Sequence, residues 1–457
     1  MSWESKTDLL SQSVRGIYGT TKTKKEIGFF TALTVVVGTV IGSGVFFKPE
    51  AVFSATGTAG LGLLAWILGG VITICGGLTA AELSAAIPET GGMVVYLRKT
   101  YGKLASYMLG WAQTVIYFPA NIAALSIIFA TQVANLFGTS DSIIIPVAIA
   151  AAVFIMLMNF LGAKIAGSFQ AVTTICKLVP LALIIIFGLF HQGDVAFRLF
   201  PMSVEDHPFL TSLGSGLVAT MFAYDGWIHV GNIAGEMKNP KKDLPKAIVI
   251  GLTSVMVVYL LINIAYLMVM PAAALAATAT PAADAANLIF GSIGGKLITI
   301  GILISVFGTI NGYTMTGIRI PYAMALQNQL PFSGWFRKLG KTAVPYNSGI
   351  VILLISIIMI FSGQFNQLTD MLIFVIWIFY TMIFFAVFIL RKREPGLVRP
   401  YKVPFYPVIP IIAILGGIFI VVNTLFTQPL NAGIGLLLTA IGLPIYFYKK
   451  NKGHINE

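Results

Sequence analysis

Charged residues are scarce in this sequence. Asp, Glu, Lys and Arg together make up 10% of the 457 residues, whereas hydrophobic residues make up 57%. A soluble globular domain carries about 25% charged residues. So low a charge content excludes an ordinary soluble enzyme or binding domain. It predicts a chain that crosses a membrane several times.

Cysteine is almost absent too. The two cysteines, Cys75 and Cys176, both lie inside apolar segments. Two such residues cannot form a metal cluster, and their number and position exclude a disulfide framework. We interpret both as small buried hydrophobic residues.

Motifs for catalysis are missing as well. The sequence has no HExxH motif, no Ser, His and Asp set at the depth of a membrane cavity, and no cysteine beside a base. We therefore expect that the chain is not an enzyme and that it binds neither a cofactor nor a metal. A channel would need rings of charge or filter carbonyls, and a receptor built on a transporter fold would be expected to carry a long soluble tail.

The charges that are present gather on one side of the predicted topology. The formal net charge is +12, but nearly all of the 29 lysines and arginines fall in segments predicted to be cytoplasmic, with only Lys48, Arg198 and Lys296 in external ones. This distribution follows the positive-inside rule. The basic balance therefore indicates orientation in a membrane and not nucleic-acid binding.

The apolar segments predict an all-α membrane protein of twelve spans, because a span needs about 20 mostly apolar residues. An even number places both termini in the cytoplasm, with tails at 1–26 and 449–457 and no signal peptide before the first span. An alanine-rich stretch at 271–289 is expected to form a short external surface helix. The predicted spans are 27–53, 59–87, 104–137, 143–162, 165–191, 211–235, 245–270, 290–326, 343–362, 367–390, 405–426 and 430–448.

The stretch Thr39–Phe47 interrupts the first span with the sequence TVIGSGVFF. Glycine destabilises a helix by about 1 kcal/mol relative to alanine, so a break is expected at Gly42-Ser43-Gly44. The free N–H groups after such a break, with the positive end of the helix dipole, suit a carboxylate. The alternative is a packing seam, since Gly38 and Gly42 are four residues apart. The stretch alone leaves both readings open.

The sixth span is interrupted in a similar way, at FAYDGW around Asp225. An acidic residue at mid-span costs roughly 2.5–3.5 kcal/mol on insertion scales, so a function is expected there. Because the two interrupted spans are five helices apart, the pattern predicts inverted repeats over 27–191 and 211–390, followed by two further spans over 405–448. In secondary transporters, such paired interruptions mark a binding site at the membrane midplane.

Four motifs carry a family resemblance: VIGSGVF in the first span, PETGGMVVYL after the second, FAYDGW in the sixth, and GEMKNPKKDLP after it. From about Lys24 to Lys449 the chain resembles the L-amino acid transporter family of the amino acid–polyamine–organocation superfamily, especially its bacterial serine/threonine or alanine/serine/cysteine exchangers. The resemblance implies a five-plus-five inverted repeat with broken helices 1 and 6. It also implies a sodium-independent antiporter of small neutral L-amino acids that works by alternating access in the cytoplasmic membrane of a bacterium.

The resemblance also implies a substrate site built mainly from main-chain groups. The substrate carboxylate would meet Ser43 and the amides of Gly42, Gly44 and Val45. The ammonium would meet the carbonyls of Ile41, Phe222, Ala223 and Tyr224. Phe222 would in addition close the site as a gate, against the plain alternative of a core or lipid-facing aromatic.

Two further residues are implied as coupling or gating groups. Lys164 would stand where related sodium symporters bind a cation, so that sodium is not needed. The alternative is a proton-coupled symporter in which Lys164 releases and takes up the proton, and the plain reading is one more cytoplasmic charge. Tyr313 would lie near the site, in contact with Lys164, or would only form hydrogen bonds between helices. It belongs to the polar run Ser305, Thr309, Asn311 and Tyr313.

Other residues are given structural roles. Asp225 is expected to accept hydrogen bonds from free amides at the break, with a proton carrier as the alternative. Gly214-Ser215-Gly216 is expected to be a close-packing patch. Glu82, Glu236 and Arg319 are expected to be ion-pair partners at helix ends. Animal relatives pair with a glycoprotein through a cysteine between spans three and four, and FGTSDSI at 137–143 has none. A monomer without a covalent partner is therefore expected.

Overall fold

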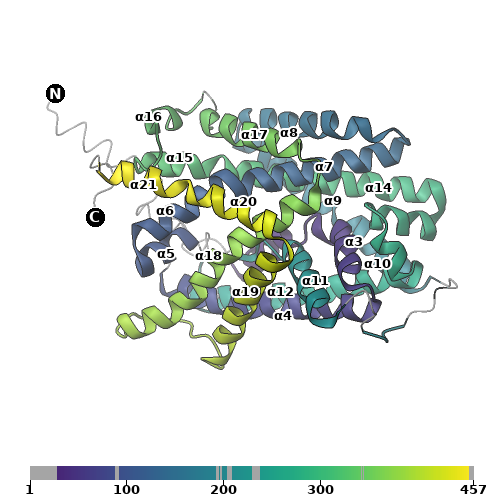
Figure 1. Ribbon diagram of the computed structural model, residues 1–457, viewed down its shortest axis with the longest axis horizontal. Helices are drawn as coiled ribbons and strands as arrows, with labels where there is room; N and C mark the ends of the chain where they lie inside the picture. The colour runs from purple at the N-terminus through teal and green to yellow at the C-terminus, as the bar shows by residue number, and fades with distance from the viewer. Residues whose placement is uncertain are drawn as a thin grey trace.

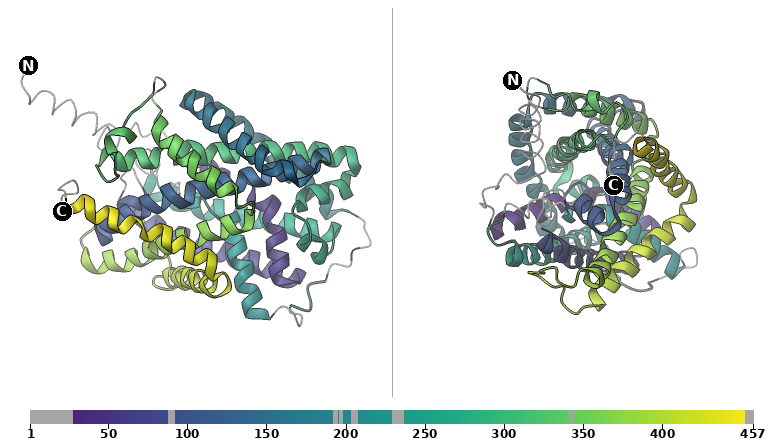
Figure 2. Two further views of the ribbon diagram at one scale, coloured as in Figure 1. Left: turned by 45° about the horizontal axis from the view of Figure 1, so that its top comes forward. Right: turned by 90° about the vertical axis from the view of Figure 1, so that its left-hand side faces the viewer.

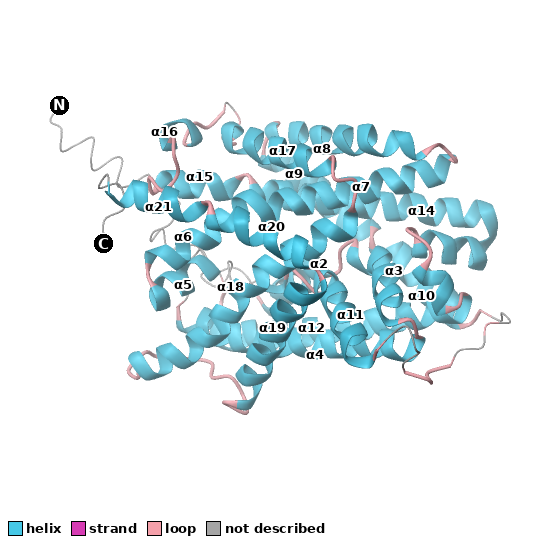
Figure 3. Ribbon diagram, in the orientation of Figure 1, coloured by secondary structure: helices cyan, strands magenta, loops and turns pink. Residues whose placement is uncertain are grey.

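The computed structural model of the chain describes residues 28–87, 92–191, 195, 198–202, 208–228, 237–340, 342 and 344–451. All elements of regular secondary structure in this part are helices, as Figure 3 shows. Eight helical stretches are long and apolar enough to cross a membrane, or nine if one bent pair counts as a span. The prediction of an all-helical chain with many apolar spans is confirmed.

The spanning stretches follow the predicted limits closely. They are α4 (Ala59–Ala86), Lys103–Phe137, Asp141–Phe160, α12 (Pro240–Val269), Pro281–Leu326, α18 (Phe365–Arg393), α19 (Val408–Thr427) and Pro429–Asn451, with α20 (Pro429–Ala440) and α21 (Gly442–Asn451) in the last. Three shorter apolar helices, α10 (Leu178–Leu189), α11 (Phe209–Ala223) and α17 (Tyr346–Ile360), lie where the fifth, sixth and ninth spans are predicted.

Several of the long helices run side by side along the long axis of the molecule, whereas α18 and α19 run obliquely to it (Figure 1). The view along this axis, on the right of Figure 2, shows them as a single bundle. Within it, α11 packs against α3 (Gly44–Thr56) and α4, and α12 packs against α4 and α2 (Phe29–Val40). The first and sixth spans are thereby brought together in the centre.

The first span is broken where the glycines predict it. Helix α2 ends at Val40, α3 begins at Gly44, and the two halves are bent by 47°. The sixth span is also interrupted: α11 ends at Ala223, and the turn that follows contains Gly226 with φ +102. A residue with a side chain rarely adopts that φ, so the turn itself requires glycine.

Two further interruptions were not predicted. In the third span a π-helix, Gln113–Tyr117, separates α6 (Lys103–Ala112) from α7 (Phe118–Phe137). In the fifth span α9 (Ala163–Cys176) and α10 are separated at Lys177. Single π-turns inside helices are frequent at functional sites. The interruption at Lys177 lies beside the break in the first span, and the π-helix lies beside the break in the sixth span, as the contacts below show.

The region 271–289 divides between two helices. A short helix, α13 (Ala272–Ala276), forms as expected, but α14 (Pro281–Gly317) begins ahead of the predicted eighth span and bends at Gly291. The patch at 214–216 packs closely as predicted, since a Cβ on Gly216 would lie 2.8 Å from the Thr56 side chain. Glu82 forms the expected ion pair, at 2.5 Å from Arg391, whereas Glu236 lies outside the described residues.

Candidate functional site

The breaks in the first and sixth spans touch each other directly. A Cβ placed on Gly44 would lie 2.7 Å from the Cα of Ala223, and one placed on Gly226 would lie 2.9 Å from the carbonyl oxygen of Thr39. Both obstacles are backbone atoms, which cannot turn aside as the end of a side chain can. The glycines of the two motifs therefore allow the two interrupted backbones to come into contact.

Two of the carbonyl groups that α2 leaves free at its end accept hydrogen bonds from side chains. The last helical hydrogen bond runs from the N–H of Ile41 to the Val37 oxygen, at 2.9 Å. The ammonium of Lys177 donates to the Gly38 oxygen at 2.6 Å, and the hydroxyl of Tyr259 to the Val40 oxygen at 2.8 Å. The C-terminal end of a helix carries partial negative charge. A buried ammonium is thus placed where it stabilises the broken end.

The amide groups at the start of α3 have no such partners. The N–H groups of Ser43, Gly44 and Val45 make no hydrogen bond to any residue that the structure describes, and the first bond of the helix runs from Phe46 N–H to the Ser43 oxygen at 2.9 Å. Ser43 is 1% exposed. Unpaired N–H groups at a buried helix start, at the positive end of its dipole, form a site suited to an anion such as a carboxylate.

Tyr259 ties the two breaks together through one hydroxyl. Besides the Val40 oxygen, its hydroxyl lies 2.9 Å from the carbonyl oxygen of Ala223. Its ring packs against those of Trp66 and Tyr224, with centroids 5.5 and 5.1 Å apart, and Tyr224 donates to the Trp66 oxygen at 3.0 Å. In the sequence, Tyr259 is one aromatic residue in an apolar span, and no local pattern distinguishes it.

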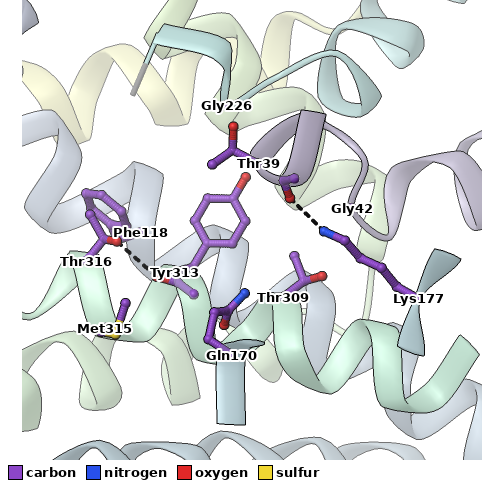
Figure 4. A pocket seen from close by; sticks show the side chains of 12 residues that line it. Thr39, Gly42, Phe118, Gln170, Lys177, Gly226, Thr309, Tyr313, Met315 and Thr316 are labelled. Carbon is purple, nitrogen blue, oxygen red and sulfur yellow. Dashed lines mark hydrogen bonds between the residues drawn. The ribbon is translucent and has the colours of Figure 1, made fainter. Parts of the chain in front are cut away.

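A cavity of about 270 Å³ lies beside the break in the first span (Figure 4). The hydroxyl of Tyr313 points towards Thr39 and Gly226 across it. Of the predicted site residues, Gly42 and Tyr313 line this cavity; Ile41, Ser43, Gly44, Val45, Phe222, Ala223 and Tyr224 are buried in the contact between the spans. The lining consists of Gly38, Thr39, Gly42, Phe118, Gln170, Lys177, Gly226, Thr309, Gly312, Tyr313, Met315 and Thr316.

The lysine beside the break is Lys177. Lys164 lies in the first turn of α9, and its side chain lies outside the described part of the chain, so its predicted contact with Tyr313 stays a prediction. Lys177 is 5% exposed and lines the cavity. In the sequence it is only one of two cations within predicted spans, and no pattern indicates that a carbonyl oxygen is its partner.

Asp225 is held by two tyrosine side chains. It is 4% exposed, accepts a hydrogen bond from Tyr380 at 2.8 Å and a further one from Tyr117. No backbone amide donates to its carboxylate within the described residues, where the two tyrosine hydroxyls are its partners. The π-helix that ends at Tyr117 has shifted the third span around its axis, and the tyrosine at its end reaches the carboxylate.

Aromatic rings and a buried lysine close the opposite side of the break. The ring of Phe222 lies edge-on to that of Phe365, with centroids 5.6 Å apart, and the Lys48 ammonium lies 5.5 Å from the centre of the Phe222 ring. Lys48, which the sequence places in an external segment, is fully buried. It forms an ion pair with Asp370 at 3.2 Å, and this carboxylate from α18 compensates the loss of water.

The polar run of the eighth span divides between two roles. Asn311 bridges helices, since it accepts from Asn159 of α8 (Ile144–Phe160) at 2.9 Å and donates to the Ala166 oxygen of α9 at 3.0 Å. Thr309 and Tyr313 line the cavity. Spacing on one helix could not separate these roles, because they depend on which neighbour each face meets.

Comparison with known proteins adds to this geometry. The model of the family described as "Amino acid permease" matches residues 27–445. The chain is 43% identical to the serine/threonine exchanger SteT of Bacillus subtilis over 94% of its own length and 98% of that protein. It is 31% identical to the large neutral amino acids transporter small subunit 2 of Mus musculus and 30% identical to the Asc-type amino acid transporter 1 of the same species, over 93% of this chain and 81% of each relative.

The family match covers nearly all of the described chain, including both breaks and the cavity between them. It agrees with the four motifs in the sequence and with the multiple apolar helices of the structure. The chain therefore belongs to the amino acid permease family.

Proposed function

We propose that the chain is a sodium-independent exchanger of small neutral L-amino acids, of the size of alanine, serine, cysteine and threonine. It acts in the cytoplasmic membrane by alternating access and uses no cofactor. The observation that carries this proposal is the contact between the two breaks, which sets unpaired amides of Ser43, Gly44 and Val45 beside the carbonyl groups that end α11. A zwitterion needs both kinds of group, and here both come from the main chain.

The substrate class follows from the kind of groups at the site. Main-chain amides recognise the carboxylate and main-chain carbonyls of Ile41, Phe222, Ala223 and Tyr224 the ammonium, so the backbone reads the features that all amino acids share. Phe118 and Tyr313 line the cavity, which has a volume of about 270 Å³. This volume supports a substrate with a small side chain. The names of the similar exchanger and transporters support the same class.

Sodium independence rests on the buried ammonium. Lys177 occupies the end of α2 with its own positive charge, 2.6 Å from the Gly38 oxygen. A second cation bound there would be strongly repelled in a site of low dielectric constant. Lys164 was expected to have this role from the resemblance, and Lys177 is the lysine that we now propose for it.

Proton-coupled symport is the second candidate, and one observation favours it. The described residues offer the Lys177 ammonium a carbonyl oxygen but no carboxylate within ion-pairing distance. A buried ammonium that has no carboxylate beside it is a candidate proton carrier. Exchange of its proton with the cytoplasm would couple transport to a proton gradient.

The finer architecture belongs to the same proposal. We propose twelve spans in two inverted repeats of five, over 27–191 and 211–390, with a terminal pair over 405–448, both termini cytoplasmic and a functional monomer. The matched interruptions of the first and sixth spans support the repeat, and the one-sided distribution of lysine and arginine supports the orientation.

The test is uptake of labelled alanine into proteoliposomes that are either loaded with unlabelled alanine or empty. Each is measured with and without external sodium, and with and without an inward proton gradient. Uptake confined to loaded vesicles and indifferent to both ions is the expected result. Accumulation in empty vesicles that requires the proton gradient would contradict the exchanger and support the proton-coupled symporter. A requirement for sodium would contradict both proposals.

A further inference from the structure

A second cavity lies on the face of the chain that is predicted to be external. Its volume is about 480 Å³, and it lies between α3, α7, the segment after α13 and the start of α18. The polar residues that line it are Glu50, Thr131, Thr278, Gln364, Asn366 and Gln367. Its lining contains one carboxylate and no lysine or arginine. We call it the outer cavity.

The carboxylate of Glu50 is held in place from one side only. Asn366 donates to its Oε2 atom at 2.8 Å, and the oxygen of the same Asn366 side chain accepts from the Lys48 ammonium at 3.1 Å. The other oxygen of Glu50, Oε1, makes no hydrogen bond with any described residue. An oriented carboxylate therefore offers a free acceptor in the outer cavity.

The charges around Glu50 do not cancel. The ammonium of Lys48 is already paired with Asp370 at 3.2 Å and hydrogen-bonded to Thr369 at 2.7 Å. One lysine thus faces two carboxylates, so a negative charge remains at Glu50. In a half-buried place such a charge attracts a cationic group more strongly than it would in open water.

The outer cavity is next to the proposed substrate site but separated from it. Phe47 and Phe365 form part of its lining, and the other side of Phe365 packs against Phe222, at 5.6 Å between centroids. Phe222 immediately precedes Ala223, where α11 ends. An amino acid that leaves the outer cavity needs only to pass this layer of aromatic rings to reach the two breaks.

We propose that the outer cavity is a second binding site, where an amino acid from outside is held before it enters the central site. Glu50 accepts a hydrogen bond from the ammonium, and the side-chain amides of Gln364 and Gln367, which line the same cavity, can donate to the carboxylate. This site would act on one side of the membrane only. The proposal rests on the proposed function, since it needs an amino acid as the transported molecule.

The test is the Glu50→Gln variant, measured separately in right-side-out and inside-out vesicles loaded with unlabelled alanine. Glutamine has the shape of glutamate and can still accept from Asn366, but it lacks the charge. We expect the KM for alanine at the external face to rise about five- to tenfold, as for the loss of a charge-assisted hydrogen bond. The KM at the cytoplasmic face and the maximal exchange rate should stay within twofold of the original chain, and Glu50→Asp should recover part of the external KM.

A steric variant keeps the proposal testable if Glu50→Gln folds poorly. Ala277 lines the outer cavity, whereas Ala273, in the neighbouring helix α13, does not. Ala277→Trp should raise the external KM and Ala273→Trp should not.

Three results would overturn the second site. An unchanged external KM in Glu50→Gln would mean that the outer cavity is only a passage. Equal changes at both faces would mean that Glu50 acts through the structure of the carrier. If replacing external sodium by choline changed the external KM of the original chain but not that of Glu50→Gln, Glu50 would hold an inorganic cation instead. Failure of the exchanger proposal is distinguishable, because the original chain would then show no exchange at either face.

Discussion

The ammonium of Lys177 lies 2.6 Å from the carbonyl oxygen of Gly38, at the point where the first span stops being helical. In an unbroken helix that oxygen would accept from the N–H four residues later, which belongs to Gly42. The lysine takes the place of this missing hydrogen bond. The break in the first span is thus stabilised by a charge from the fifth span, and any rearrangement of α2 has to move or release that contact.

Removing this ammonium should strongly impair exchange. Lys177→Ala leaves the Gly38 oxygen buried without a donor, which costs about 1–3 kcal/mol, and α2 loses its tie to the fifth span. If this energy is lost from the transport step, we expect the exchange rate to fall about five- to 150-fold when labelled alanine uptake is measured in loaded proteoliposomes. Lys164→Ala is the matched control within the same span. If that variant lost activity while Lys177→Ala kept it, the coupling role would return to Lys164.

Substitution of Gly44 should prevent the two breaks from meeting. In Gly44→Ala the new Cβ would lie 2.7 Å from the Cα of Ala223, and neither backbone can give way without separating α3 from α11. We expect loss of exchange together with a lower midpoint of thermal unfolding in detergent. Gly28→Ala is the control, because a Cβ there meets nothing within 4 Å. A Gly44→Ala variant with full exchange would show that the close contact is not needed.

Much of this arrangement could be predicted from the sequence. Glycine and mid-span acidic residues have strong local costs in a helix, so the breaks at Gly42-Ser43-Gly44 and around Asp225 are visible without a structure. The partners of those breaks are not visible. Lys177 binds a carbonyl oxygen, a group that every residue carries, and Tyr259 is one aromatic residue among many in apolar spans.

Two sets of contacts were missed for the same physical reason. The carboxylate partner of Lys48, Asp370, lies more than 300 residues later in the chain. The tyrosines that donate to Asp225 come from the third and tenth spans. Tyr117, in the third span, lies at the end of a π-helix, which no sequence pattern predicts. Pairings that depend on how distant helices face each other leave no signal in local spacing.

The hydrogen bonds that Tyr117 and Tyr380 donate to Asp225 should be needed for full exchange activity. Asp225→Asn keeps the shape but removes the charge and turns one acceptor into a donor, so the hydroxyl of Tyr117 or Tyr380 loses a good partner. We expect the exchange rate to fall about tenfold, as for the loss of a hydrogen bond to a charged group. Tyr380→Phe, which removes one donor and leaves the other, should cost less. Equal exchange in Asp225→Asn and the original chain would make the carboxylate dispensable.

The buried ion pair between α3 and α18 should respond differently to single and double substitution. Lys48→Met leaves Asp370 buried without its cation and should destabilise the chain by about 3–5 kcal/mol. The double variant with Lys48→Met and Asp370→Leu removes both charges, and buried pairs replaced in this way are often neutral for stability. Thermal unfolding in detergent measures both. A double variant no more stable than Lys48→Met would show that the pair contributes more than charge balance.

The most direct measurement is a structure of the chain determined with L-alanine bound. We expect the carboxylate of alanine to lie within about 2.7–3.2 Å of the amide nitrogens of Gly44 and Val45. Its ammonium should contact the carbonyl oxygens at the end of α11. Alanine bound elsewhere, with those amides still unpaired, would contradict the central claim that the two touching breaks form the substrate site.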